Sequence, residues 1–151
     1  MQAQRLDAYH VAPAAMNVLR AVETYLHQSS LDETLIELVK MRASQINGCA
    51  YCLDRHSKVL RQNGESEQRL YVLDAWEESS LYSPRERAAL AWTDALTLIA
   101  KTRAPDAVYH EVHRQFDDKE LVDLTVLIGM INLWNRLAIS LRYQHPVAAT
   151  P

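Results

Sequence analysis

The segment between residues 121 and 141 constrains the fold of this chain more than any other feature. On a helix, its apolar side chains would cover most of the circumference: Leu121, Val122, Leu124, Val126, Leu127, Ile128, Met130, Ile131, Leu133, Trp134, Leu137, Ile139 and Leu141. Residues 117–120 resemble a helix cap, so the helix is expected to span residues 117–143. A helix that is apolar on nearly every side must be buried on nearly every side. We therefore predict a helical bundle in which other subunits cover this helix; the alternative is a central helix within one monomer.

The scarcity of turn residues indicates the same class. The chain of 151 residues has 3 Gly and 5 Pro, whereas β-sandwiches and barrels need many turns. A chain of roughly 150 residues corresponds to one domain, and no linker, repeat or low-complexity tract is visible. We therefore expect an all-α fold with a single helical domain over residues 1–151.

Start and stop signals divide this domain into six or seven helices. Two Ser-x-x-Glu capping boxes, at residues 30–33 and 83–86, mark helix starts. Gly48 and Gly64 are expected to end helices, because glycine readily adopts the left-handed conformation. The expected helices span residues 13–27, 30–45, 49–63, 66–76, 83–101, 106–116 and 117–143.

The charge pattern lacks the basic surface that is typical of nucleic-acid binding. Lys and Arg (16 together) and Asp and Glu (19 together) are interspersed along the chain, for a net charge of −3, and no basic stripe is present. The most apolar stretch, around residues 126–130, is far shorter than the roughly 20 residues of a membrane span. The first seven residues lack the apolar region of a secretion signal. We therefore expect a cytoplasmic protein with no nucleic-acid or membrane partner.

The two cysteines lie three residues apart at the expected start of helix 49–63. Because thiols stay reduced in the cytoplasm, Cys49 and Cys52 are not expected to form a permanent structural disulfide. At this helical spacing their Cβ atoms would be roughly 5–6 Å apart, so a modest adjustment would let the sulfurs bond. So short a loop would add little stability. Helix starts and Cys-x-x-Cys motifs favour the reactive thiolate, so we expect a bond that is made and broken.

Two further residues complete the candidate site. His56 lies one helical turn after Cys52, on the same face, where it could carry a proton or pair with a thiolate. Glu37 lies on the preceding helix. It would face His56, directly or through a water molecule, if the two helices pack antiparallel across the turn at Gly48. Together these residues supply a nucleophile, a base, an orienting carboxylate and a second thiol.

The same residues allow other interpretations. Cys49, Cys52 and His56 could be three ligands of a zinc ion, with Glu37 as the fourth. The cysteines could instead be buried and inert. Taken singly, His56 and Glu37 would more often be ordinary helix residues, but their joint spacing with the cysteines favours a redox site.

Three polar residues interrupt the apolar segment near the end of the chain. They are Asn132, Asn135 and Arg136. Because a buried polar group needs a partner, we expect them to form hydrogen bonds across helices or subunits. A role for Arg136 in substrate binding is a weaker alternative.

The spacing Glu37-(x11)-Cys49-(x2)-Cys52-(x3)-His56 resembles the core pattern of the AhpD-like alkylhydroperoxidases, within the carboxymuconolactone decarboxylase superfamily. The surrounding residues 46–57, Ile-Asn-Gly-Cys-Ala-Tyr-Cys-Leu-Asp-Arg-His-Ser, are also similar, as are residues 131–138, Ile-Asn-Leu-Trp-Asn-Arg-Leu-Ala. The resemblance covers residues 30–142.

This resemblance implies an all-helical fold that assembles into a homotrimer or homohexamer and reduces hydroperoxides with a redox dithiol. By position, Cys52 would be the peroxidatic cysteine, Cys49 the resolving cysteine, and His56 and Glu37 a proton relay. No cofactor or metal is implied. The reductant would be a lipoyl-bearing or thioredoxin-like protein. Well-characterised peroxidase members have a histidine before the second cysteine, where this chain has Tyr51.

Three other functions are alternatives to a peroxidase. A thiol–disulfide oxidoreductase would act on a protein thiol instead of a peroxide. Decarboxylase or lactone chemistry occurs elsewhere in the superfamily, although that branch does not depend on a cysteine pair. A non-enzymatic assembly module would use the pair as a redox sensor.

Overall fold

The computed structural model describes residues 3–147, and within this range the chain is helical without any β-strand. The expected all-α fold is therefore confirmed. Nine α-helices and one 3₁₀ helix, η1, follow one another in this range: α1 (Ala8–Val11), α2 (Pro13–His27), α3 (Glu33–Asn47), α4 (Ala50–Gln62), α5 (Glu67–Val72), η1 (Leu73–Ala75), α6 (Pro84–Thr97), α7 (Ile99–Thr102), α8 (Asp106–Gln115) and α9 (Asp118–Leu141).

Each expected helix has a counterpart, with differences at a few ends. The one-turn helix α1 was not predicted. α3 begins after Asp32, whose side chain accepts a hydrogen bond from the N–H of Leu35. The predicted cap at Ser30 is therefore wrong, because a second good capping residue lies closer to the helix start. The helix expected over residues 83–101 is divided at Leu98 into α6 and α7.

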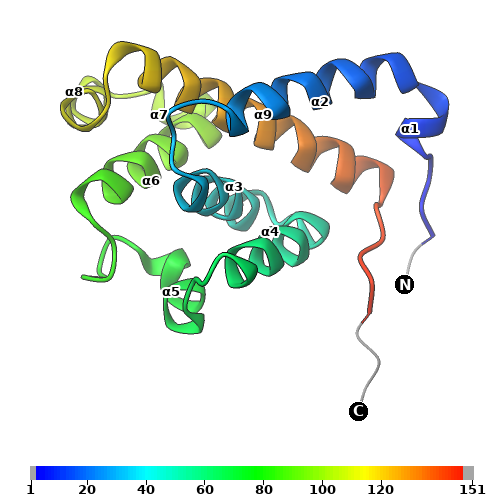
Figure 1. Cartoon of the computed structure of the whole chain (residues 1–151), viewed down its shortest axis with the longest axis horizontal. Coiled ribbons are helices and arrows are strands. Elements are labelled where there is room, and N and C mark those ends of the chain that lie inside the picture. Colours follow the sequence, from blue (N-terminus) through cyan, green and yellow to red (C-terminus); the bar gives the residue numbers. More distant parts are fainter. Residues whose placement is uncertain (1–2, 148–151) are drawn as a thin grey trace.

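α3 lies at the centre of the bundle, in contact with α4, α6 and α9 (Figure 1). Every residue from Leu35 to Met41 is buried, including the charged residues Glu37 and Lys40. A central helix with two buried charges must supply partners for both of them. α3 is therefore both the core of the fold and the support of the candidate site.

One face of α9 remains uncovered in the single chain. Val122, Val126, Gly129 and Leu133 form this apolar stripe, and its three side chains are between 37% and 61% exposed. The opposite face packs against α3 and α6. The alternative that α9 is the central helix of one monomer is therefore wrong, because α3 takes that position.

α9 is also long and apolar enough to cross a membrane, which corrects the expectation from the sequence. Its most apolar window has a mean hydropathy of 1.4, and 44% of that window is buried in the bundle. A core helix passes the same test. α9 also carries Asp123, Asn132 and Asn135 as buried polar residues. Asp123 accepts hydrogen bonds from the hydroxyl of Tyr25 at 2.8 Å and from Lys119 at 2.6 Å. The buried face of this helix thus packs against protein, as in a core helix, while its apolar stripe stays exposed in the single chain.

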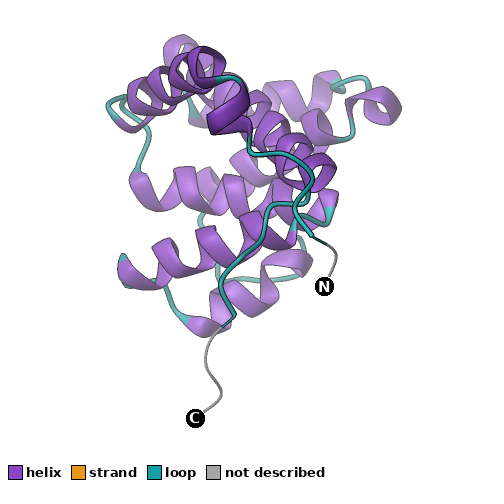
Figure 2. Cartoon of the chain, turned by 90° about the vertical axis from the view of Figure 1, so that its right-hand side faces the viewer, coloured by secondary structure: helices purple, strands orange, loops and turns teal. Residues whose placement is uncertain are grey.

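The N-terminal and C-terminal segments come together at one end of the molecule (Figures 1 and 2). The backbone N–H of Arg5 donates to the carbonyl of Leu141 at 2.9 Å, and its guanidinium donates to the carbonyl of Ser140 at 2.9 Å. These contacts bring the segment before α1 against the end of α9, next to the start of α4.

Candidate active site

The turn between α3 and α4 places the two cysteines. α3 ends at Asn47, and Gly48 adopts a left-handed conformation with φ of 68°, as its role as a helix stop predicts. The N–H of Cys49 donates to the carbonyl of Ser44 at 3.0 Å, which closes the turn. A side chain at Gly48 would strain this backbone. α4 therefore starts immediately after the turn and packs back along α3.

Cys49 and Cys52 form a disulfide at the start of α4. Cys49 caps the helix, its sulfur accepting a hydrogen bond from the N–H of Cys52 at 3.3 Å, and the two Cα atoms are 5.3 Å apart. The two residues are 1% and 3% exposed. They form a small apolar cluster with Ala138, against which Tyr51 and Tyr143 pack. Once the bond opens, the free N–H groups at the helix start would stabilise a thiolate in this pair.

His56 and Glu37 are in direct contact, without a bridging water. The imidazole Nδ1 of His56 lies 2.7 Å from Oε2 of Glu37, and both side chains are buried. An ionised carboxylate can only accept, so Nδ1 carries the proton and Nε2 is left free as a base. Burial alone would raise the pKa of Glu37. The hydrogen bond from His56, the positive charge of its ring when protonated, and Lys40 together outweigh burial and hold this pKa below its ordinary value.

Lys40 is a buried cation beside this pair. Its ammonium donates to Glu23 at 2.8 Å, to Nε2 of His27 at 3.0 Å and to Glu37 at 3.4 Å. Its side chain is 4% exposed. The three N–H groups of the ammonium thus meet three acceptors, as a buried charge requires. Glu23 in turn accepts from the indole of Trp134 at 2.8 Å.

The same contacts fix the state of His27. Because the Lys40 ammonium can only donate, Nε2 of His27 accepts from it, and Nδ1 donates to Glu33 at 2.8 Å. Ligand atoms of His27, Glu33 and Glu37 lie within 4.8 Å of one another. The Lys40 ammonium bonds to His27 and Glu37. A lysine therefore already supplies the positive charge that a metal ion would bring to this group.

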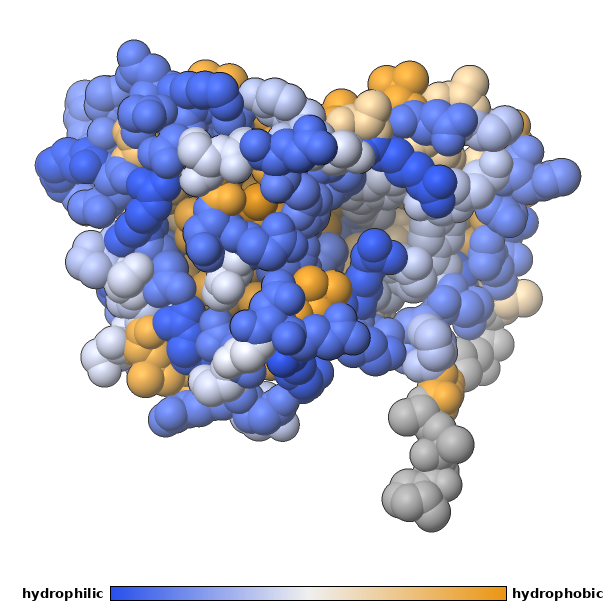
Figure 3. Space-filling view, viewed as in Figure 1, coloured by the Kyte–Doolittle hydropathy of each residue, from blue (hydrophilic) through white to orange (hydrophobic). Residues whose placement is uncertain are grey.

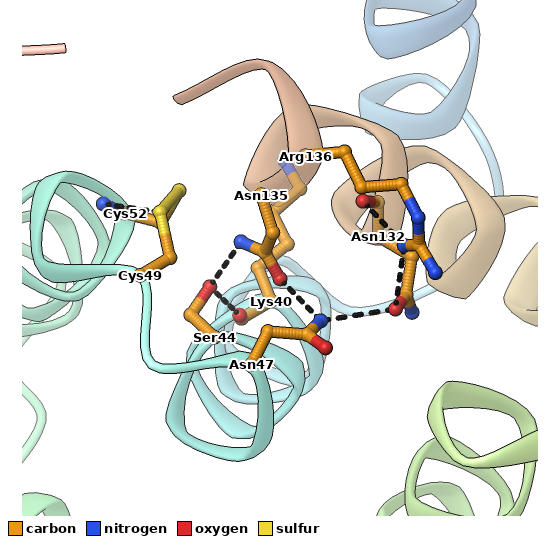
Figure 4. The surroundings of a disulfide bond; sticks show 8 residues. All are labelled: Lys40, Ser44, Asn47, Cys49, Cys52, Asn132, Asn135 and Arg136. Carbon is orange, nitrogen blue, oxygen red and sulfur yellow. Dashed lines mark hydrogen bonds between the residues drawn. A yellow bond between two sulfur atoms is a disulfide. The ribbon is translucent and has the colours of Figure 1, made fainter. Parts of the chain in front are cut away.

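A polar network on the other side of α3 supports the turn (Figure 4). The amide of Asn135 donates to the hydroxyl of Ser44 at 3.0 Å, and Ser44 donates to the carbonyl of Lys40 at 2.7 Å. The amide of Asn47 donates to Asn135 at 2.8 Å and to Asn132 at 3.0 Å. The predicted hydrogen bonds of Asn132 and Asn135 across helices are confirmed. They fasten the end of α3, and hence Cys49, to α9.

Arg136 forms no hydrogen bond to another helix among residues 3–147. Its guanidinium donates within α9, to the carbonyl of Asn132 at 2.8 Å. It lines neither of the two cavities next to the disulfide. The structure therefore gives no support to the alternative in which Arg136 binds substrate.

The two sulfur-bearing residues face different cavities. Cys52 lines a cavity of about 630 Å³, which we call the Cys52 cavity, together with His56, Glu37 and Lys40. Cys49 lines a smaller one of about 280 Å³, the Cys49 cavity. The walls of the Cys52 cavity come from α2, α3, α4 and α9, and Figure 3 shows a recess between α2 and α4 on its face of the molecule.

The structure brings the four predicted site residues together as two bonded pairs. Cys49 is bonded to Cys52, and His56 to Glu37. Within residues 3–147, no hydrogen bond joins His56 to a sulfur, although His56 and Cys52 share a cavity. Among the described residues, the ligand atoms that lie within 4.8 Å of one another are those of His27, Glu33 and Glu37, so these four do not converge as the ligand set of a zinc ion.

Sequence reasoning missed Lys40 and Tyr143. A signal for Lys40 was present, because it and Glu37 are the only charged residues in the otherwise apolar stretch 35–41. Tyr143 gave no comparable signal, since its place depends on how the end of α9 meets the start of α4.

The family model described as the carboxymuconolactone decarboxylase family matches residues 11–95. The uncharacterized protein YdfG of Bacillus subtilis is 46% identical over 138 residues, which are 91% of this chain and 94% of YdfG. The uncharacterized protein YnjA of Escherichia coli is 37% identical over 107 residues, which are 70% of this chain and 58% of YnjA.

Solved structures agree with this assignment. A protein of unknown function from Agrobacterium tumefaciens, for which an AhpD role in antioxidant defence has been proposed, superimposes with a TM-score of 0.93. It is 44% identical, and the match covers 97% of this chain and all of that one. An uncharacterized peroxidase-related protein from Silicibacter has a TM-score of 0.80 at 25% identity, covering 91% of this chain and 73% of that one. The chain therefore belongs to the carboxymuconolactone decarboxylase family, as one of its AhpD-like members.

Proposed function

We propose that this chain is a thiol-dependent peroxidase, which reduces organic hydroperoxides through the Cys49–Cys52 pair. One observation carries the proposal: Cys52 shares a cavity with the bonded pair His56–Glu37, whereas Cys49 faces a separate cavity. Cys52 therefore has a base in its own cavity. Cys49, on the other side of the disulfide, would re-form the bond to Cys52.

The size and burial of the site favour a small-molecule oxidant. A volume of about 630 Å³ is within the range of ligand pockets, which run from roughly 300 to 1,000 Å³. The two cysteines are at most 3% exposed, which disfavours direct attack on a folded protein's thiol. This burial places a thiol–disulfide oxidoreductase second among the candidates.

The reaction begins from the dithiol form. Nε2 of His56 takes the proton of the Cys52 thiol while Nδ1 stays bonded to Glu37. The thiolate attacks the terminal oxygen of the hydroperoxide, and the O–O bond breaks. The proton held by His56 passes to the leaving oxygen, so an alcohol departs and Cys52 becomes a sulfenic acid.

The second half of the reaction closes the disulfide. The Cys49 thiol attacks the sulfur of Cys52, and the hydroxyl leaves with the thiol proton as water. A dithiol donor then supplies two electrons and two protons and becomes a disulfide itself. We propose a lipoyl-bearing protein as this donor, acting in a reducing cytoplasm, because a lipoyl arm is a small dithiol that can enter the cavity. A thioredoxin-like protein is the second candidate, since its thiol would have to reach the same buried sulfurs.

The test is consumption of cumene hydroperoxide with a reduced lipoyl donor. We expect sustained turnover by the wild type, none by Cys52→Ser, and by Cys49→Ser a single oxidation without turnover. Full turnover by Cys52→Ser together with loss in Cys49→Ser would contradict the assigned roles.

In stopped flow, faster oxidation of the reduced protein by small disulfides than by hydroperoxide would favour the oxidoreductase. Turnover of a lactone by the double Cys→Ser variant would favour superfamily chemistry independent of thiols.

We also propose that the protein is a homo-oligomer, a homotrimer or homohexamer, assembled through the apolar stripe of α9. Its three side chains are more than a third exposed in the single chain, and contiguous exposed apolar surface is typical of protein interfaces.

A further inference from the structure

Tyr143 has a buried hydroxyl without a partner. Among residues 3–147, two buried side-chain atoms lack a hydrogen bond, Oε1 of Gln45 and the hydroxyl oxygen of Tyr143. Such atoms are rare in native proteins, and each needs an explanation. Gln45 lines neither cavity, whereas Tyr143 lines both and packs against the cysteines. The orphan hydroxyl therefore belongs to the immediate surroundings of the disulfide.

A strained turn holds this side chain in place. Arg142, which ends α9, has a left-handed backbone with φ of 56°, an uncommon conformation for a residue other than glycine. The N–H of Tyr143 donates back to the carbonyl of Ala138 at 2.9 Å. The ring meets that of Tyr51 edge to face, with centroids 5.5 Å apart. Strain of this kind persists only where surrounding contacts impose it, and here they direct Tyr143 onto the start of α4.

The hydroxyl keeps its proton at neutral pH. Burial raises the pKa of Tyr143, and the neighbouring Tyr9, Asp7 and Tyr51 raise it further. The group is thus a hydrogen-bond donor with no acceptor in the described protein, at the wall of the cavity that Cys52 lines. A ligand in that cavity would supply the acceptor.

We infer that Tyr143 is a catalytic residue whose hydroxyl donates a hydrogen bond to the oxygen that leaves from the hydroperoxide. This inference rests on the proposed peroxidase function. The leaving oxygen gains negative charge as the sulfur–oxygen bond forms and the O–O bond breaks, and a donor already in place stabilises that charge. The proton that neutralises it is still the one His56 took from Cys52, so the balance of the reaction is unchanged.

The test compares two oxidants in single-turnover oxidation of the reduced protein. Cumene hydroperoxide releases an alkoxide, which needs a hydrogen-bond donor, whereas peracetic acid releases a stable carboxylate. We expect Tyr143→Phe to slow the reaction with cumene hydroperoxide by about a hundredfold, as loss of one oxyanion donor does, and to slow peracetic acid much less. Tyr109→Phe, on α8, is the matched control and should leave both rates unchanged.

Stability provides the second measurement. Because the hydroxyl has no partner in the protein, Tyr143→Phe should unfold in urea at the same or a higher concentration than the wild type. Lower stability, equal slowing with both oxidants, or no slowing would overturn the inference. Each of these results leaves the peroxidase proposal standing if the wild type reacts and Cys52→Ser does not. A wild type that does not react with hydroperoxide overturns both.

Discussion

Buried charge at Lys40 and Glu37 links the chemistry of single residues to the stability of the fold. The pair lies on α3 with Glu23 and His27 of α2 as further partners. The sequence predicted the contact of His56 with Glu37, because helical spacing and one turn were enough to bring them face to face. It could not predict the role of Lys40, since lysine is ordinarily exposed and its partners lie on a separate helix.

Replacement of Lys40 should destabilise the protein strongly. In Lys40→Met the carboxylates of Glu37 and Glu23 lose their buried cation, and breaking a buried pair in this way costs about 3–5 kcal/mol. Urea unfolding measures the change. Lys58→Met is the matched control, since Lys58 pairs with Asp54 at the surface with its side chain 52% exposed, and exposed pairs contribute about 0–1 kcal/mol. A similar loss in both variants would contradict the role of burial.

The lowered pKa of Glu37 predicts a pH dependence on the acid side. As the pH falls below the ordinary value of 4.5, this carboxylate takes up a proton in the unfolded chain before it does so in the folded protein. The stability that Glu37 contributes is therefore complete above pH 4.5 and is lost as the pH falls through its lower folded pKa. In Glu37→Gln the free energy of unfolding should fall less steeply in this range, whereas Glu77→Gln, at an exposed position, should keep the wild-type slope.

Local signals decide the ends of most elements, and this is why they could be predicted. The capping box at Ser83 and Glu86 is present, and Gly48 ends α3 as expected. The division at Leu98 could not be predicted, because it depends on a contact between residues of different turns. There the hydroxyl of Thr102 donates to the carbonyl of Ala95 at 2.6 Å.

The two left-handed glycines next to α4 allow a matched test of its boundaries. Gly48 and Gly64 have φ of 68° and 88°, and a Cβ at either would meet no atom within 4 Å. Alanine should therefore strain only the backbone, at about 1–2 kcal/mol in each case. Only Gly48→Ala, directly before Cys49, should also change the rate at which hydroperoxide closes the disulfide. An equal change of that rate in Gly64→Ala would show that stability alone is responsible.

The arrangement of the whole molecule shows why the apolar segment 121–141 is not the central helix of one monomer, the alternative that its hydropathy left open. α9 is more apolar than α3, yet α3 lies in the middle of the bundle (Figure 1), and the stripe of α9 is exposed in the single chain. The buried polar residues of α3, namely Glu37, Lys40 and Ser44, lower its hydropathy although each has a partner. The apolar pattern of a helix therefore does not by itself show how deeply the helix lies in one chain. A helix with polar residues can be central when its neighbours supply hydrogen-bond partners for them.

This difference leads to a prediction about assembly. If the stripe of α9 is covered by other copies of the chain, a charge at Val126 is buried and unpaired in the oligomer but stays near water in the monomer, where the side chain is 38% exposed. Val126→Glu should therefore sediment as a folded monomer at concentrations where the wild type is a trimer or hexamer. Tyr71→Glu, at a 74% exposed position on α5, should leave the wild-type size unchanged. Circular dichroism separates dissociation from unfolding. A wild type that sediments as a monomer would show that the stripe remains open to solvent, and an unchanged oligomer in Val126→Glu would place the contact between subunits on another face.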